Sequence, residues 1–216
     1  MLALFDLDGT LLDTAQAHAH AAKTALARRG LPCDPDTVHR FLVAHDAASA
    51  GMDETAYYAV WQDMQPLYRE AQHTVRTFPG VPEVLSSLAR EGCRLGVVTS
   101  KRRWAVQREL EITGLAASFE VVVCREDTDQ HKPSPQPLLR AQSLVGLRGG
   151  VYLGDQDTDV IAARAAGMRP IGAGWGWSGA AALRDAGAAA VIGAFAELPS
   201  VLREPEDDAF RARAAE

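Results

Sequence analysis

The sequence predicts an α/β fold built on a doubly wound parallel sheet, and three observations lead to this class. From residue 78 onward, short runs rich in valine, leucine and isoleucine alternate with segments of helical spacing. The links between these segments are short. Acidic and hydroxyl side chains gather where the apolar runs end. Strands that alternate with helices in this way pair in parallel, with helices on both faces of the sheet.

The first strand is predicted at the start of LALFDLDGTLLDT, residues 2–14. Its apolar residues 2–5 are followed at once by Asp6 and Asp8, with Gly9 behind them. Burying one carboxylate is costly, and a second one nearby adds repulsion. Acid at the end of a core strand therefore requires a chemical reason.

The other predicted core elements follow in chain order. Apolar runs of strand length alternate with segments that carry apolar residues at helical spacing, and Gly92 and Gly167 mark two of the helix ends. Strands are predicted at residues 94–100, 118–124, 149–155, 168–174 and 189–193, and helices at 81–92, 102–112, 135–145, 158–167 and 179–186.

Residues 15–77 form a predicted helical insert without a strand signal. An alanine-rich helix ends at Gly30, and Asp34 before Pro35 starts a second one as cap and first-turn proline. A third helical stripe contains Pro66, which we expect to kink or divide it. The predicted domains are therefore a core of residues 1–14 and 78–203, the insert 15–77, and a charged, frayed tail 204–216.

Composition narrows the possible partners of this chain. Its 216 residues carry a net charge of −6 with both signs scattered, which argues against nucleic acid or an anionic membrane as partner. No apolar stretch approaches the ~20 residues that span a bilayer, and the chain starts directly with a strand, so we expect no export signal. Three scattered cysteines indicate reduced thiols and a cytoplasmic location.

The residues at the predicted strand ends form one candidate site. Parallel strands place their carboxyl ends at one edge of the sheet, where ligands bind. Asp6 and Asp8 follow the first strand, Thr99 and Ser100 the second, and Asp155 with Asp159 a later one. Lys132 lies in the loop HKPSP, residues 131–135.

Carboxylates gathered in this way repel one another unless a cation joins them, and oxygen ligands with open water positions suit Mg²⁺. With a lysine and a threonine hydroxyl, such a site can receive a phosphoryl group. Each residue alone also has a structural explanation: Asp8 as a turn residue, Thr99 as a hydroxyl bonded to backbone, and Lys132 as a surface lysine.

Four motifs resemble those of the haloacid dehalogenase superfamily of aspartyl-phosphate hydrolases. The segments FPGVPEVLSSLAREG, residues 78–92, and GWGWSGAAALRDAGA, residues 174–188, look like segments of its phosphoglycolate phosphatase-like branch. DLDGT at residues 6–10 is similar to its D-x-D-G-T motif, and VVTS at 97–100 to its apolar run ending in Thr or Ser. KPSP at 132–135 resembles its lysine motif, and GDQDTD at 154–159 its G-D-x-x-x-D motif.

This resemblance implies a Rossmann-like core with a helical cap, and a Mg²⁺-dependent phosphatase acting on a small phosphorylated metabolite. Asp6 would be the nucleophile that forms an aspartyl phosphate, and Asp8 the general acid and base. Asp6, the Asp8 carbonyl and Asp155 would hold Mg²⁺, with Asp159 in support.

The remaining implied roles concern phosphate and leaving group. Thr99, the Ser100 N–H and Lys132 would bind phosphate. Polar residues of the cap would select the substrate, and Arg40, His45 and Asp46 are the candidates. The alternative is that these residues only form a solvated helix end. The alternatives are a phosphomutase or phosphonate hydrolase on the same core, or a non-catalytic binding protein with this fold. Oligomeric state and the identity of the leaving group do not follow from the sequence.

Overall fold

The chain folds into two compact units, which the computed structural model describes for residues 1–44 and 46–203. The core unit comprises Met1–Asp13 and the chain from Thr77 onward, and the insert unit comprises Thr14–Arg76. The predicted tail 204–216 and His45 lie outside the described residues. The domain limits predicted from sequence differ from these units by one residue at each junction.

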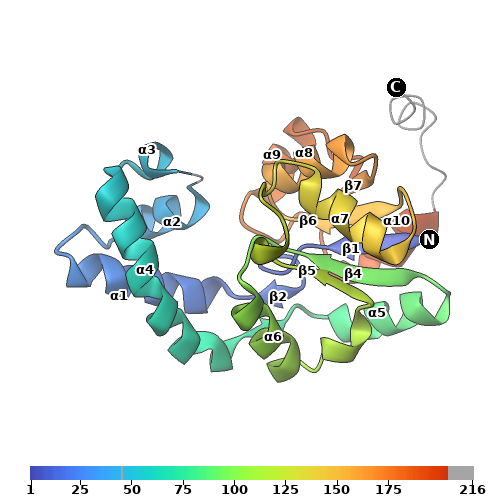
Figure 1. The fold of residues 1–216 in the computed structure, drawn as a ribbon, viewed down its shortest axis with the longest axis horizontal. Helices are drawn as coiled ribbons and strands as arrows, with labels where there is room; N and C mark the ends of the chain where they lie inside the picture. Colours follow the sequence, from blue (N-terminus) through green and yellow to red (C-terminus); the bar gives the residue numbers. More distant parts are fainter. Residues whose placement is uncertain (45, 204–216) are drawn as a thin grey trace. The chain divides into compact units, whose positions relative to one another are not determined.

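A six-stranded sheet in the order β5-β4-β1-β6-β7-β8 forms the centre of the core unit (Figure 1). All five pairings are parallel, which the sequence predicted. The strands are β1 Leu2–Phe5, β4 Arg94–Val98, β5 Val121–Val123, β6 Val151–Gly154, β7 Arg169–Ala173 and β8 Ala190–Ile192.

The register of β1 with its two neighbours aligns three strand ends. Phe5, the last residue of β1, pairs with Val97 of β4 and with Leu153 of β6. The residues that follow these three strands therefore leave the sheet at the same edge. The order of the strands thus brings distant parts of the sequence to one place.

Helices cover both faces of the sheet, with α7 and α8 on one side and α5 and α6 on the other (Figure 1). The six α-helices of the described core are α5 Val81–Arg90, α6 Arg103–Ile112, α7 Gln136–Val145, α8 Asp157–Ala165, α9 Gly179–Asp185 and α10 Leu198–Arg203. Short 3₁₀ turns η2 Ala116–Ser118, η3 Arg125–Asp127 and η4 Phe195–Glu197 complete the unit. This arrangement confirms the predicted doubly wound α/β class.

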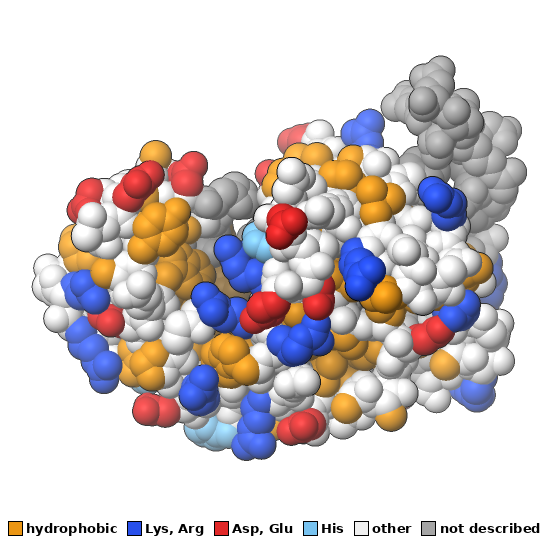
Figure 2. Space-filling model, in the orientation of Figure 1, with side chains coloured by type: hydrophobic (Ala, Val, Ile, Leu, Met, Phe, Trp, Pro, Cys, Tyr) orange, Lys and Arg blue, Asp and Glu red, His pale blue; other side chains and the backbone are white. Residues whose placement is uncertain are grey.

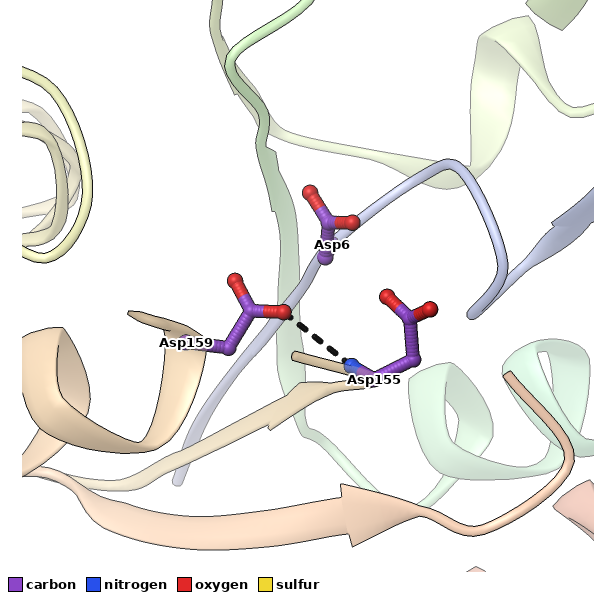
Figure 3. Close-up of side chains that lie close together, drawn as sticks. All are labelled: Asp6, Asp155 and Asp159. Atoms are coloured by element: carbon purple, nitrogen blue, oxygen red, sulfur yellow. Dashed lines mark hydrogen bonds between the residues drawn. The ribbon is translucent and has the colours of Figure 1, made fainter. Parts of the chain in front are cut away.

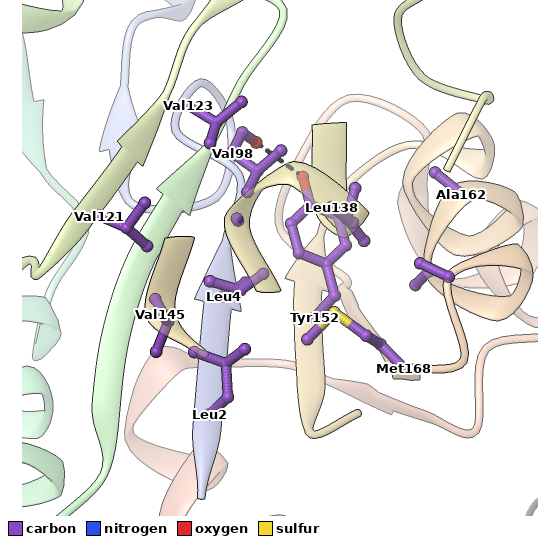
Figure 4. Packing of buried hydrophobic residues seen from close by; sticks show 13 residues of the cluster. Leu2, Leu4, Val98, Val121, Val123, Leu138, Val145, Tyr152, Ala162 and Met168 are labelled. Atoms are coloured by element: carbon purple, nitrogen blue, oxygen red, sulfur yellow. Dashed lines mark hydrogen bonds between the residues drawn. The ribbon is translucent and has the colours of Figure 1, made fainter. Parts of the chain in front are cut away.

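Alternation along β1 supplies a hydrophobic core on each face of the sheet. Leu2 and Leu4 point to the side of α7 and α8, and the intervening Ala3 and Phe5 point to the other side. On that second side the Phe5 ring packs 6.0 Å from the ring of Phe195. Figure 4 shows the first cluster: Leu2, Leu4, Val98, Val121, Val123, Leu138, Ala141, Val145, Tyr152, Ala162, Ala163, Ala166 and Met168.

The insert unit is helical, and a strand of two residues begins at its end. Its helices are α1 Ala15–Arg28, α2 Pro35–Val43, α3 Ala47–Ala50 and α4 Glu54–Ala71, followed by the turn η1 Gln72–Thr74. The strand β3 Arg76–Thr77, which the sequence did not reveal, pairs with β2 Leu12–Asp13. Strands of two residues are too short to show a hydrophobic period.

The expected division of the third insert helix at Pro66 does not occur, because α4 continues from Glu54 to Ala71. Proline removes one backbone donor and disfavours the helix interior. Here buried residues occur on both sides of it, with Met64 before and Leu67 and Tyr68 after. Burial of this continuous apolar face outweighs the loss of one hydrogen bond.

The surface carries charges of both signs. Figure 2 shows Lys and Arg side chains intermingled with Asp and Glu over the face that it displays. Within the described part of the chain, the helices are all too short or too polar to cross a bilayer.

Gly96 in β4 offers a test of how tightly the side chains of neighbouring strands pack in the core. A Cβ atom at Gly96 would lie 2.4 Å from Cγ1 of Val121 and 2.8 Å from Cδ2 of Leu4, and Val121 is a stiff β-branched neighbour. We predict that Gly96→Ala lowers the free energy of unfolding by ~1–3 kcal/mol, measured by urea denaturation. Gly193→Ala is the control, because its Cβ meets only the Glu197 carboxylate at 3.3 Å. Equal stability of both variants would show a loosely packed sheet.

Candidate active site

Three buried carboxylates meet at the carboxyl edge of the sheet (Figure 3). Asp6 follows β1, Asp155 follows β6, and Asp159 lies in the first turn of α8. One oxygen of each lies within 4.8 Å of the others. The parallel register explains this meeting, and the Asp6 N–H donates to the Leu153 carbonyl oxygen at 2.8 Å.

Asp159 fixes the loop that carries Asp155. Its Oδ2 atom accepts a hydrogen bond from the backbone N–H group of Asp155 at 3.1 Å (Figure 3). It accepts a second one from the backbone N–H group of Gln156 at 3.0 Å. These N–H groups belong to the start of α8, where donors lack a partner within the helix and a carboxylate is favoured. Oδ2 of Asp159 therefore already binds two backbone N–H groups.

Lys132 joins two of the carboxylates. Its Nζ atom lies 2.7 Å from Oδ1 of Asp6 and 2.5 Å from Oδ1 of Asp159. The side chain is buried, with 7% of its surface exposed. Within the described part of the chain, Oδ2 of Asp6 accepts no hydrogen bond, so this oxygen faces the site without a protein partner.

Tyr152 is a site residue that the sequence analysis missed. Its hydroxyl accepts a hydrogen bond from Lys132 Nζ at 3.0 Å and donates one to the Val98 carbonyl oxygen at 2.8 Å (Figure 4). A buried tyrosine needs a partner for its hydroxyl. A single tyrosine within the otherwise aliphatic strand VYLG was therefore the signal that could have found it.

A second missed group holds Asp155. The Trp177 backbone N–H donates to Oδ2 of Asp155 at 2.8 Å, and the buried Thr10 hydroxyl lies 3.4 Å from Oδ1. Glycine is required next to this carboxylate. A Cβ atom at Gly9, which has φ +73°, would lie 2.3 Å from Oδ2 of Asp155, and one at Gly176 would lie 2.2 Å from its Cβ.

Asp8 is separate from the cluster of three carboxylates. Its Oδ1 atom forms an ion pair with Lys101 Nζ at 2.6 Å, and Lys101 also binds both carboxylate oxygens of Glu109 at 2.7 Å. Neither Lys101 nor Glu109 was a candidate in the sequence. Glu109 lies on α6, far along the chain from Asp8, so no local spacing could reveal their connection.

The two hydroxyl candidates after β4 differ in their environment. Thr99 is buried, donates its backbone N–H to the Val123 carbonyl oxygen at 3.0 Å, and accepts from the Lys101 N–H through Oγ1 at 3.2 Å. Ser100 is exposed. Both leave the sheet at the edge where Asp6 and Asp155 lie.

Burial and mutual repulsion shift the pKa values in this cluster. Burial, opposed by Lys132 and assisted by Asp159, raises the pKa of Asp6 from 3.8 to about 7. Burial and the neighbouring Asp159 and Asp6 raise the pKa of Asp155 well above its usual range. Burial alone would lower the pKa of Lys132, but Asp159 and Asp6 raise it well above 10.5.

The balance of charges in the cluster favours a further cation. Three buried carboxylates against one ammonium leave an excess that a divalent cation would neutralise. The donors are all hard oxygen atoms, which fit Mg²⁺ better than a softer metal. The residues present therefore fit a metal centre, with Asp6 and Asp155 as the carboxylates least committed to other partners.

The cap candidates lie in the insert unit. Arg40 is exposed in the last turn of α2. Asp46 caps α3: its Oδ1 accepts from the Ser49 N–H at 2.7 Å, and the Ser49 hydroxyl accepts from the Asp46 N–H at 3.2 Å. His45 lies outside the described residues. A substrate role for these three residues stays a prediction.

A parallel α/β sheet with three buried carboxylates and a lysine at its carboxyl edge is typical of α/β proteins that bind an anionic ligand together with a cation at this edge. Comparison with known proteins gives the family. A family model for haloacid dehalogenase-like hydrolases matches residues 3–173. The phosphoglycolate phosphatase of Xanthomonas campestris pv. campestris strain 8004 is 35% identical over 183 residues, covering 81% of this chain and 83% of that protein.

Two further relatives extend this comparison. The pyrophosphatase PpaX of Bacillus pumilus is 31% identical over 189 residues, covering 83% of this chain and 86% of that protein. A solved haloacid dehalogenase-like family hydrolase from Streptococcus pneumoniae shares the fold with a TM-score of 0.83 at 19% identity, covering 94% of this chain and 98% of that one. The chain belongs to the haloacid dehalogenase-like hydrolase family, which confirms the resemblance and the enzyme class expected from its motifs.

The raised pKa of Asp6 predicts a pH-dependent effect of Asp6→Asn on stability. Because the folded pKa of about 7 lies above the unfolded value of 3.8, the folded protein retains a proton, and the stability linked to it is lost as pH rises through 7. An amide is never charged, so in EDTA the variant should gain Tm over the wild type, and the gain should be larger at about pH 8 than at about pH 5.

The measurement is thermal unfolding of both proteins across this pH range. A change of 1 kcal/mol corresponds to about 2–4 °C for a chain of this size, so a gain of several degrees is measurable. Asp185→Asn, at an exposed position at the end of α9, is the control for loss of one surface charge. A difference in Tm that does not depend on pH would show that Asp6 does not titrate in this range.

Proposed function

We propose that this protein is a Mg²⁺-dependent phosphatase that hydrolyses a small phosphorylated metabolite through an aspartyl phosphate on Asp6. The observation that carries the proposal is the Asp6 carboxylate, buried beside Asp155 and held through one oxygen by Lys132 at 2.7 Å. The names of the phosphatase and pyrophosphatase relatives support the same chemistry.

In the first step, an oxygen of Asp6 attacks phosphorus, a new P–O bond forms, and the bond to the leaving oxygen breaks. Lys132 keeps Asp6 oriented and places a positive charge where phosphate charge accumulates. Water then attacks the aspartyl phosphate, which releases inorganic phosphate and regenerates the carboxylate. Thr99 and the Ser100 N–H are proposed to bind the phosphate with Lys132.

Asp8 is proposed to transfer the protons in both steps. It gives a proton to the leaving oxygen in the first step and takes one from the attacking water in the second. The carboxyl of Asp8 is 21% exposed, which leaves it more accessible than the buried carboxylates around Lys132. Accessibility is what a group that exchanges protons with substrate and water requires.

Asp6, the Asp8 backbone carbonyl and Asp155 would hold the Mg²⁺, and Asp159 would support the site by fixing the Asp155 loop and Lys132. When bound, Mg²⁺ supplies positive charge that stabilises the transferring phosphoryl group. The Trp177 N–H and Thr10 restrain Asp155 in position to act as a ligand.

The substrate class we propose is a phosphoglycolate-like or sugar phosphate ester. Relatives named phosphoglycolate phosphatase support the first of these, and the relative named pyrophosphatase adds pyrophosphate as a third candidate. The insert, residues 15–77, is proposed to select the leaving group as a cap, with Arg40, His45 and Asp46 as its polar candidates. Product analysis separates hydrolysis from a phosphomutase or phosphonate hydrolase reaction, and a failure to turn over any ester would favour a binding protein.

The covalent step predicts the effect of Asp6→Asn on activity. An amide cannot form an acyl phosphate, so turnover should fall by at least ~10³-fold. The measurement is phosphate release from a panel of phosphate esters, with phosphoenzyme detected by intact mass after acid quench of the wild type. Asp185→Asn should retain activity. Near-normal turnover by Asp6→Asn would exclude the covalent mechanism.

The proposed metal centre predicts the effect of Asp155→Asn. Loss of one anionic ligand should raise the Mg²⁺ concentration needed for half-maximal activity by about tenfold or more. Asp157→Asn removes a charge from the same helix start at a residue that is not one of the three clustered carboxylates, and it serves as the control. The same Mg²⁺ titration curve for Asp155→Asn and the wild type would remove Asp155 from the centre.

A further inference from the structure

We propose that Lys101 and Glu109 are positioning residues for Asp8, which hold its carboxyl in place for proton transfer to the leaving oxygen. The inference rests on the proposed function, in which Asp8 is the acid and base. It assigns a catalytic purpose to an ion-pair network that the family motifs quoted above do not contain.

The network connects Asp8 to the helix α6 through a single ammonium group. Lys101 Nζ lies 2.6 Å from Oδ1 of Asp8 and 2.7 Å from each carboxylate oxygen of Glu109. The Lys101 side chain is 8% exposed and that of Glu109 is 0% exposed. A pair so well shielded from water is held by strong electrostatic attraction and resists displacement.

Glu109 is placed where packing alone would favour an apolar residue. It lies on the buried face of α6 with Ala105, Val106 and Leu110. A fully buried carboxylate on such a face is costly unless it is paired. Both of its oxygens bind Lys101, so its presence is explained by the lysine that it holds.

The backbone of Lys101 is also restrained from both sides. Its N–H donates to Oγ1 of Thr99 at 3.2 Å, and its carbonyl oxygen accepts from the Arg125 N–H at 3.0 Å. Lysine has a long flexible side chain, but here hydrogen bonds fix both its backbone and its ammonium group. The position of Oδ1 of Asp8 is therefore set by the β4–α6 segment, which also carries Thr99.

Orientation of Asp8 matters most when the leaving oxygen needs a proton. Phenol is a much weaker acid than 4-nitrophenol, so phenyl phosphate depends on protonation of the leaving group far more than 4-nitrophenyl phosphate does. The two esters are otherwise similar in shape. A misplaced Asp8 should therefore slow phenyl phosphate selectively.

The experiment measures release of the phenol in a single turnover, with enzyme in excess and Mg²⁺ present, for both esters. We expect Lys101→Met to slow release from phenyl phosphate at least about tenfold more than release from 4-nitrophenyl phosphate. Lys101→Arg, which keeps the positive charge, should restore part of this difference. Arg102→Met, at the neighbouring exposed position, is the matched control and should leave both rates unchanged.

Lys101→Met removes the ammonium group that both carboxylate oxygens of the buried Glu109 bind, which can impair folding. The double variant Lys101→Met/Glu109→Gln also removes the buried negative charge, and it should show the same selective loss with a Tm closer to the wild type. Equal slowing of both esters in the double variant would overturn the inference and give the network a purely structural role. If the wild type releases neither phenol and hydrolyses no other phosphate ester of the panel, the proposed function itself is wrong and the inference falls with it.

Discussion

The site depends on one buried ammonium group, that of Lys132, which lies between Asp6 and Asp159 and against the Tyr152 hydroxyl. Without this charge, the three carboxylates could not be buried together, because each would add its repulsion to the cost of desolvation. Even with it, three buried carboxylates face one ammonium group, and burial raises the pKa of Asp6 to about 7. This set of oxygen donors fits a divalent cation, which is why we propose a metal centre here. A fully neutralised cluster would be a structural ion pair and nothing more.

The parallel sheet lowers the conformational entropy that is lost when such a cluster is assembled. The register of β1 with β4 and β6 sends three chain segments out at one edge, so that rigid strands rather than flexible loops place Asp6, Thr99 and Asp155. Gly9 completes the arrangement, since a side chain there would overlap the Asp155 carboxylate. Preorganisation of this kind is what electrostatic catalysis requires, because the groups need not move during the reaction.

Much of the fold was predictable because its signals are local. Apolar runs separated by helical segments gave the parallel α/β class and every strand of the six-stranded sheet to within a few residues. The division of the helix that we expected as one outcome at Pro66 does not occur, because proline removes one hydrogen bond, whereas the buried face of α4 stabilises the whole helix. The pair β2 and β3 was missed because two residues carry no period.

The sequence by itself determined the class of fold, the family motifs and the candidates at the strand ends, since residue types and spacings specify short-range structure and known chemistry. Only the tertiary structure decided which groups support those candidates. Tyr152 fixes Lys132, the Trp177 N–H restrains Asp155, and Lys101 with Glu109 holds Asp8. These pairings join residues that lie far apart in the chain. These contacts depend on the order of the strands in the sheet and on which face of each helix is buried. Neither property can be predicted from a local pattern of residues.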